Sequence, residues 1–158
     1  KELLETMKKY GYKGIFALHP AHSRDVDDFN NNDVFDIIVN PVYSKLLSEA
    51  KLLLTDYSSV CFDFSYLRKP ILYTQYDKDT FFKLQKTYVP GYFTHDKDGF
   101  GPVVTNYEDA VKEIIKFIKN DCALDKKYRK RIDEFFEFND KNNCKRVYKA
   151  ILDIDNNK

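Results

Sequence analysis

Two adjacent serines, Ser58 and Ser59, stand where they could bind a phosphate group. They follow the apolar run Leu52–Leu54 and precede a segment with helical spacing. A turn into a helix brings hydroxyls and free backbone N–H groups together at the positive end of the helix dipole, which suits a phosphate. Asp63 lies four residues after Ser59, on the same helical face, where its carboxylate could hold ribose hydroxyls. Plain N-capping by the serines, with Asp63 as a solvated acid, explains the same spacing.

His19 is a second candidate, because it ends the apolar run that starts at Gly14 and stands directly before Pro20. An imidazole there could donate a hydrogen bond to a phosphate and stabilise charge on a departing group. A structural histidine with satisfied hydrogen bonds is the alternative. His95 lies in the turn-like segment 94–99 and is predicted to be exposed.

The elements that must position these residues alternate between strand and helix. Short apolar runs at 14–19, 36–39, 51–55 and 70–74 predict strands buried on both faces, as in a parallel sheet. Helices are predicted at 1–11, with Gly11 as the C-terminal cap, from Asn40 and Pro41 onward, and after Ser59. The alternation predicts an α/β fold with one open parallel sheet covered by helices. Ligands bind beyond the carboxyl ends of the strands in such sheets, which favours His19, Asn40 and the Asp56–Ser59 turn.

The second half of the chain is predicted to end in helices. Asn106 caps the first of them, and Glu108 and Asp109 in its first turn suit the helix dipole. Two further helices are predicted from apolar stripes, which consist of Tyr128, Ile132, Phe135 and Phe136 in one and Cys144, Val147, Tyr148, Ile151 and Leu152 in the other.

Composition excludes several other classes of protein. The chain has 158 residues, 43% of them hydrophobic, which is enough for a core and excludes disorder. Lys and Arg number 26 against 25 Asp and Glu, so no overall field favours nucleic acid. Three cysteines without a C-x-x-C pair argue against a disulfide framework or a zinc site and favour a reducing, cytoplasmic compartment. Asp-x-Asp pairs do not converge with histidine, so no metal site is predicted.

Longer motifs give the sequence a family resemblance. The string Leu53–Phe64, then Lys69–Tyr73 and Tyr76-Asp77, resembles the CDP-glycerol glycerophosphotransferases, the teichoic acid polymerases and their relatives in capsule and wall polymer synthesis. Leu18-His19-Pro20 upstream and Gly101–Val104 downstream match the family's order, so the resemblance covers roughly residues 15–118.

The resemblance implies a two-domain glycosyltransferase-B-like fold, of which this chain resembles the C-terminal, donor-binding half. It implies that His19 acts at the donor diphosphate, that Ser58 and Ser59 bind phosphate, and that Asp63 binds ribose. An acceptor hydroxyl would attack the distal phosphorus of CDP-glycerol, and CMP would leave. The loop from Asn40 to Tyr43 is expected to lie against cytosine, although Tyr43 can equally belong to the core.

Two features of the family are absent from the sequence: its opening strand with a Pro-Thr-Trp-Arg-like motif, and its N-terminal acceptor domain. We therefore expect one donor-binding domain over 1–158, with C-terminal helices over 106–158, that binds the donor without turning it over alone. The expected partners are the nucleotide-diphosphate donor, a polyol-phosphate or lipid-linked polymer acceptor, and the missing N-terminal domain. No cofactor, no metal and no nucleic acid are expected.

Two other functions remain open from the sequence. One is a sugar transferase or sugar-nucleotide epimerase of the same architecture. The other is a non-catalytic module that docks on an anionic membrane surface through the basic run Lys126–Arg131. The expected location is the bacterial cytoplasm. The basic run also suggests peripheral attachment to the inner face of the cell membrane.

Overall fold

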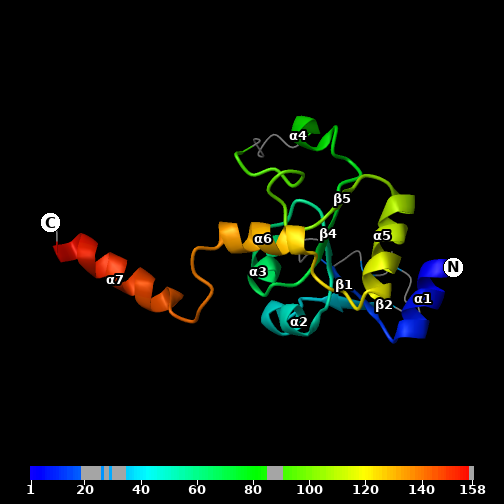
Figure 1. The fold of residues 1–158 in the computed structure, drawn as a ribbon, viewed down its shortest axis with the longest axis horizontal. Helices are drawn as coiled ribbons and strands as arrows, with labels where there is room; N and C mark the ends of the chain where they lie inside the picture. The colour runs from blue at the N-terminus through cyan, green and yellow to red at the C-terminus, as the bar shows by residue number, and fades with distance from the viewer. Residues whose placement is uncertain (19–25, 27–28, 30–34, 85–90, 157–158) are drawn as a thin grey trace.

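Parallel strands and the helices between them form the fold (Figure 1). The structure is a computed structural model, and it describes residues 1–18, 26, 29, 35–84 and 91–156. Its strands within these ranges are β1 (Gly14–Leu18), β2 (Phe35–Val39), β3 (Leu53–Thr55), β4 (Ile71–Thr74) and β5 (Val103–Val104). Its helices there are α1 (Glu2–Tyr10), α2 (Tyr43–Glu49), α3 (Val60–Tyr66), α4 (Phe81–Leu84), α5 (Tyr107–Lys119), α6 (Lys126–Phe135) and α7 (Asn143–Asn156).

The strands pair in two parallel sheets. β1 pairs with β2 from Gly14 opposite Phe35 to Leu18 opposite Val39, and β3, β4 and β5 form a second sheet in that order. The predicted α/β class with parallel strands is therefore confirmed, but the prediction of a single four-stranded sheet is wrong for the described residues. β5 was not predicted as a strand, because two residues are too short to give an apolar run.

Helices cover both faces of the sheet that β3, β4 and β5 form, as predicted. Successive side chains of β4 point to opposite faces. Ile71 and Tyr73 pack toward α3 and α6, in a cluster whose buried members also include Cys61, Phe64, Phe100 and Ile132. Leu72 faces the other way and packs with Val104 and with Ala110 of α5. β4 is therefore the strand around which the core is built.

The prediction that every strand is buried on both faces is wrong for β1. Ile15 and Phe16 keep 47% and 41% of their surface exposed. Phe35 of β2 packs against a small cluster that Met7 of α1 and Ile118 of α5 form. The described part of this sheet has two strands, so it offers fewer neighbours to cover its side chains than the three-stranded sheet does.

Three of the four predicted helix ends are confirmed, including the start of α3 directly after Ser59. Gly11 ends α1 in the left-handed conformation, at a φ of 71°, and the Asn106 side chain accepts a hydrogen bond from the Asp109 N–H at 2.8 Å. Asn40 does not begin a helix as predicted: α2 starts at Tyr43. Asn40 has a φ of 56°, a left-handed conformation that asparagine adopts more readily than most residues. It turns the chain before the helix.

Helix α7 forms as predicted, but its apolar stripe is not buried. Val147, Tyr148 and Ile151 are all exposed, and Figure 1 shows α7 extending away from the sheets. The segment before it is attached to α3, because the Tyr66 hydroxyl donates to the Asp140 carbonyl at 2.9 Å. Neither α7 nor any other helix in the described ranges has the length and apolarity needed to cross a bilayer.

Lys69 closes the C-terminal end of α2. Its ammonium group donates to the carbonyls of Leu47, Ser48 and Ala50 at 2.9, 2.5 and 2.8 Å. The last carbonyls of a helix have no partner within it, and a lysine has three N–H groups to give. Lys69 thereby ties the start of β4 to the end of α2.

We predict that Lys69→Met lowers the free energy of unfolding by about 1.5–3 kcal/mol, since hydrogen bonds from a charged donor contribute about that much. Urea unfolding measures this change. Lys45→Met removes an exposed lysine from the same helix and should change stability by less than about 0.5 kcal/mol. Equal effects of the two substitutions would contradict the role given to Lys69.

Candidate functional site

The carboxyl ends of β3, β4 and β5 meet at one edge of their sheet. All three strands run parallel, with Thr55 opposite Tyr73 and Thr74 opposite Val104. The residues that follow them therefore emerge at the same edge: the Asp56–Ser59 turn after β3 and Gln75–Asp77 after β4. In open parallel sheets, this edge is where ligands bind.

The hydroxyls of Ser58 and Ser59 are exposed at this edge. Ser59 is the residue before α3, yet its side chain makes no capping hydrogen bond. The Ser58 hydroxyl oxygen accepts from the Val60 N–H at 3.4 Å, which is long for such a bond. N-capping therefore accounts weakly for Ser58 and does not account for Ser59.

The backbone amides of the turn are only partly available to a ligand. The Cys61 N–H donates to the Ser58 carbonyl at 3.3 Å, and the Phe62 N–H donates to the Ser59 carbonyl at 3.0 Å. The expected row of free amides therefore stops before Cys61. The two serine hydroxyls are the clearer donors that the turn offers.

Asp63 lies on α3, one helical turn after Ser59, as the spacing predicted. Its side chain is exposed and borders a hollow of about 420 Å³. The other residues around this hollow are mostly aromatic: Phe62, Tyr66, Phe135, Phe136, Glu137, Phe138 and Asn143. Ser59 and Asp63 are thus on one face of the helix, and of the two only Asp63 borders the hollow.

His95 reaches the same edge, although the sequence predicted it to be exposed. Its ring lies edge-on to the rings of Tyr57, Tyr73 and Phe93, with centroids 5.8, 4.7 and 5.5 Å away. Burial lowers the pKa of this imidazole, while Asp96 and Asp56 oppose the shift and Lys78 adds to it. His95 is therefore neutral at neutral pH. The prediction was wrong because two of these contacts, Tyr57 and Tyr73, are distant in sequence.

The turn that carries His95 is tightly held. The Thr94 N–H donates to the Asp98 carboxylate at 2.7 Å, and Arg131 of α6 donates to the Gly99 carbonyl at 2.8 Å. A Cβ on Gly99 would lie 2.1 Å from the His95 carbonyl oxygen, so only glycine fits there without a shift. These contacts fix the imidazole against the sheet edge.

Two buried donors at this edge were not foreseen from the sequence. The ring of Tyr57 stacks on Phe81, with centroids 3.7 Å apart, and its hydroxyl, which lies near the Asp77 carboxylate, makes no hydrogen bond of normal geometry with the described residues. Burial, with a smaller effect of Asp77, raises the pKa of Tyr57 to about 12, so the group remains an O–H donor. Gln75 is 2% exposed, and its Nε2 is likewise unpartnered there. Nothing in the spacing of either residue signals this state.

The other predicted site residues are not part of this cluster. Asn40 and Tyr43 are exposed and follow β2, which belongs to the other sheet. His19 lies outside the described residues, so its part in the site stays a prediction.

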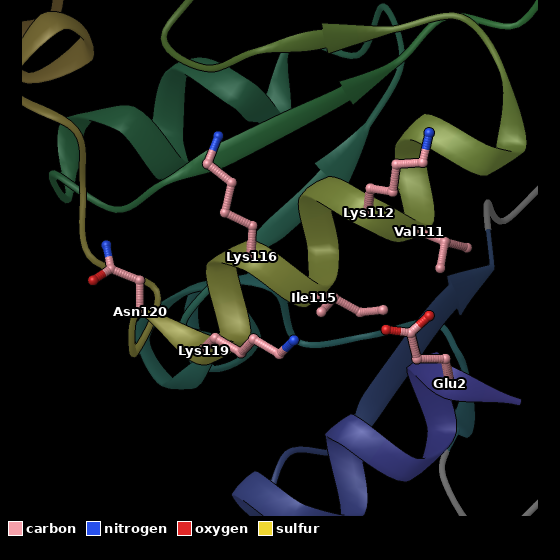
Figure 2. Close-up of a pocket in the computed structure, with 7 residues that line it drawn as sticks. All are labelled: Glu2, Val111, Lys112, Ile115, Lys116, Lys119 and Asn120. Carbon is pink, nitrogen blue, oxygen red and sulfur yellow. The ribbon is translucent and has the colours of Figure 1, made fainter.

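A second hollow, of about 410 Å³, lies between α1 and α5 (Figure 2). Figure 2 shows that the ammonium groups of Lys112 and Lys116 point away from Glu2, and each pairs with an acid of its own helix, Asp109 and Glu113 respectively. None of the predicted site residues lines this hollow.

Comparison with known proteins gives one consistent result. The family model described as CDP-Glycerol:Poly(glycerophosphate) glycerophosphotransferase matches residues 1–153. The chain is 41% identical, over its whole length, to the minor teichoic acid biosynthesis protein GgaB of Bacillus subtilis (strain 168), and covers 17% of that protein. It is 31% identical, over 71% of its length, to a teichoic acid poly(glycerol phosphate) polymerase of Staphylococcus epidermidis (strain ATCC 35984), of which it covers 13%.

A solved structure extends the match to the fold. The wall teichoic acid polymerase TagF superimposes on 97% of this chain with a TM-score of 0.65 and 25% identity, and the chain covers 37% of that structure. The glycosyltransferase-B-like architecture expected from the sequence is thereby confirmed. The chain spans less than a fifth of the two relatives named above.

We predict that His95 makes stability depend on pH near neutrality. Its pKa is about 6.5 in the unfolded chain and lower in the folded one, so the unfolded chain binds more protons between these values. The free energy of unfolding should therefore fall as the pH falls below about 6.5. His95→Gln should lose less stability than the original protein between about pH 8 and pH 5.5, measured by urea unfolding.

Asp98, which accepts hydrogen bonds from Thr94, does not affect this comparison between the two proteins. Its hydrogen bonds to Thr94 lower the pKa of its carboxyl below the usual 3.8, so it titrates at more acidic pH, and equally in both proteins. Parallel stability profiles of the two proteins between about pH 8 and pH 5.5 would contradict the burial of a neutral His95.

Proposed function

Because the chain belongs to the CDP-glycerol:poly(glycerophosphate) glycerophosphotransferase family, we propose that it binds the nucleotide donor of a polyol-phosphate transferase. The donor is CDP-glycerol or a related CDP-polyol. An acceptor hydroxyl attacks the distal phosphorus, the bond from that phosphorus to the bridging oxygen breaks, and CMP leaves. The acceptor is a polyol phosphate or a lipid-linked polymer of teichoic acid or capsule synthesis.

The observation that carries the proposal is the pair of exposed hydroxyls at the carboxyl edge of β3. Ser58 and Ser59 lie where parallel sheets bind ligands; Ser59 makes no capping hydrogen bond, and Ser58 accepts only a long one from Val60 at the start of α3. Hydroxyl donors suit the oxygens of a diphosphate. In this proposal Asp63, one turn along the same helix, accepts hydrogen bonds from the ribose hydroxyls.

Phosphoryl transfer depends mainly on holding the reacting groups in place and on stabilising charge over the phosphate oxygens. In this proposal Ser58 and Ser59 hold the diphosphate, and His19 stabilises the charge that develops as CMP departs. Asn40 and Tyr43 follow β2 of the other sheet, and their expected contact with the cytosine stays a prediction. The transfer moves a phosphoryl group between oxygens without oxidation or reduction, so no redox cofactor takes part.

The basic run on α6 supports donor binding better than it supports docking on a membrane. Arg131 donates to carbonyls of the loop that carries His95. Arg129 and Lys130 pair with Asp133 and Glu134 of their own helix. Half of the six residues in this run therefore already have acidic or carbonyl partners within the domain.

We predict that Ser58→Ala and Ser59→Ala each weaken CDP binding by about tenfold or more, since each removes one hydrogen bond to a charged group. Calorimetric titration of the chain measures the affinity, and wild type should bind CDP more tightly than UDP or GDP. Ser48→Ala, which removes an exposed serine hydroxyl on α2, should leave the affinity unchanged. Absence of CDP binding to wild type would refute the proposed function.

We predict that His19→Ala, in the natural-length protein, slows CMP release by about 10²–10³, the loss typical for one donor that stabilises developing charge. CDP affinity should change much less. His22→Ala removes the other histidine of the same segment and serves as the control; it should leave the rate within about twofold. Near-normal turnover of His19→Ala would remove His19 from the mechanism.

A further inference from the structure

Gln75 and Tyr57 leave two buried hydrogen-bond donors without an acceptor. The Gln75 side chain is 2% exposed, and its Nε2 has no partner among the described residues. The Tyr57 hydroxyl makes no hydrogen bond of normal geometry there, although the Asp77 carboxylate lies near it. Such groups are rare in folded proteins, because a buried donor without a partner loses its hydrogen bonds to water and gains none in return. Each therefore calls for a ligand or another reason to be kept.

Both donors belong to the same corner of the sheet edge. The Gln75 N–H continues the ladder to the Val104 carbonyl at 2.8 Å, so its side chain lies on the same face of β4 as that of Tyr73, two residues earlier. The Tyr73 ring contacts His95, and His95 contacts Tyr57. The His95 loop thus lies between Tyr57 and the face of β4 to which Tyr73 and Gln75 belong.

The order of residues along the edge indicates which part of a donor they meet. Ser58 and Ser59 hold the diphosphate in the proposed function, and Asp63 lies beyond them along α3, toward the nucleoside. Tyr57 precedes the serines, and Gln75 follows the neighbouring strand. In a CDP-polyol the group on the other side of the diphosphate from the nucleoside is the polyol.

We propose that Gln75 and Tyr57 are specificity residues that donate hydrogen bonds to the polyol-phosphate unit of the donor. The inference rests on the proposed function. An amide N–H and a phenolic O–H are neutral donors, which suit hydroxyl and phosphate-ester oxygens. Phe81 fixes the Tyr57 ring by stacking, so Tyr57 is already positioned before a ligand binds.

The proposal separates stability from recognition. If the two groups donate hydrogen bonds to a ligand, apolar side chains of similar shape in their place remove buried donors that have no acceptor in the free protein. The free protein then keeps or gains stability. If the two groups serve the fold, the same replacements lower stability. Gln75→Leu and Tyr57→Phe make these changes with little change in volume.

The experiment measures the affinities of CDP-glycerol and CDP for the natural-length protein by calorimetry, with the melting temperature of the free protein. Wild type should bind CDP-glycerol more tightly than CDP. Each variant should reduce that preference by about fivefold to tenfold, as expected for one lost hydrogen bond. CDP affinity should stay constant, and the melting temperature should be unchanged or higher.

Ser65→Ala is the matched control. Ser65 is also buried, but its hydroxyl donates to the Phe62 carbonyl at 2.9 Å, so this variant should melt at a lower temperature and keep the preference for CDP-glycerol. An unchanged preference in both Gln75→Leu and Tyr57→Phe would overturn the inference, as would equal affinity of wild type for CDP and CDP-glycerol. Failure of wild type to bind CDP at all would instead refute the proposed function.

Discussion

Parallel pairing of β3, β4 and β5 is the constraint on which the candidate site depends. Because the three strands run in one direction, the segments that follow them emerge at a single edge. Helices α3 and α5 on opposite faces bury β4 and fix its register. The exposed serines after β3 and the buried Gln75 after β4 emerge at the same edge for this reason, although they lie 16 or more positions apart in sequence.

At this sheet edge the loop that carries His95 is firmly held, while a buried side-chain donor lacks an acceptor. Arg131 and the Asp98 carboxylate hold the loop that presses His95 against Tyr57 and Tyr73. Yet the Gln75 amide remains without an acceptor in the described part of the chain. Proteins keep such costly groups mostly at functional sites, where a ligand completes the bonds that the fold leaves open.

Local signals in the sequence were reliable, and signals that depend on distant contacts were not. Gly11 and Asn106 end and begin their helices as predicted, because capping depends on a few neighbouring residues. Asn40 was misread as a helix cap, since its side chain also favours the left-handed turn that it forms. The burial of His95 and Gln75 is set by strands and loops far away in sequence, so no spacing rule could reveal it.

The most direct test of the donor-binding edge is a nuclear magnetic resonance titration of the chain with CDP, in which each backbone amide reports on its own surroundings. The account predicts saturable shifts concentrated at residues 56–63 and 75–77. Shifts concentrated instead around the hollow between α1 and α5, or no saturable shift anywhere, would contradict it.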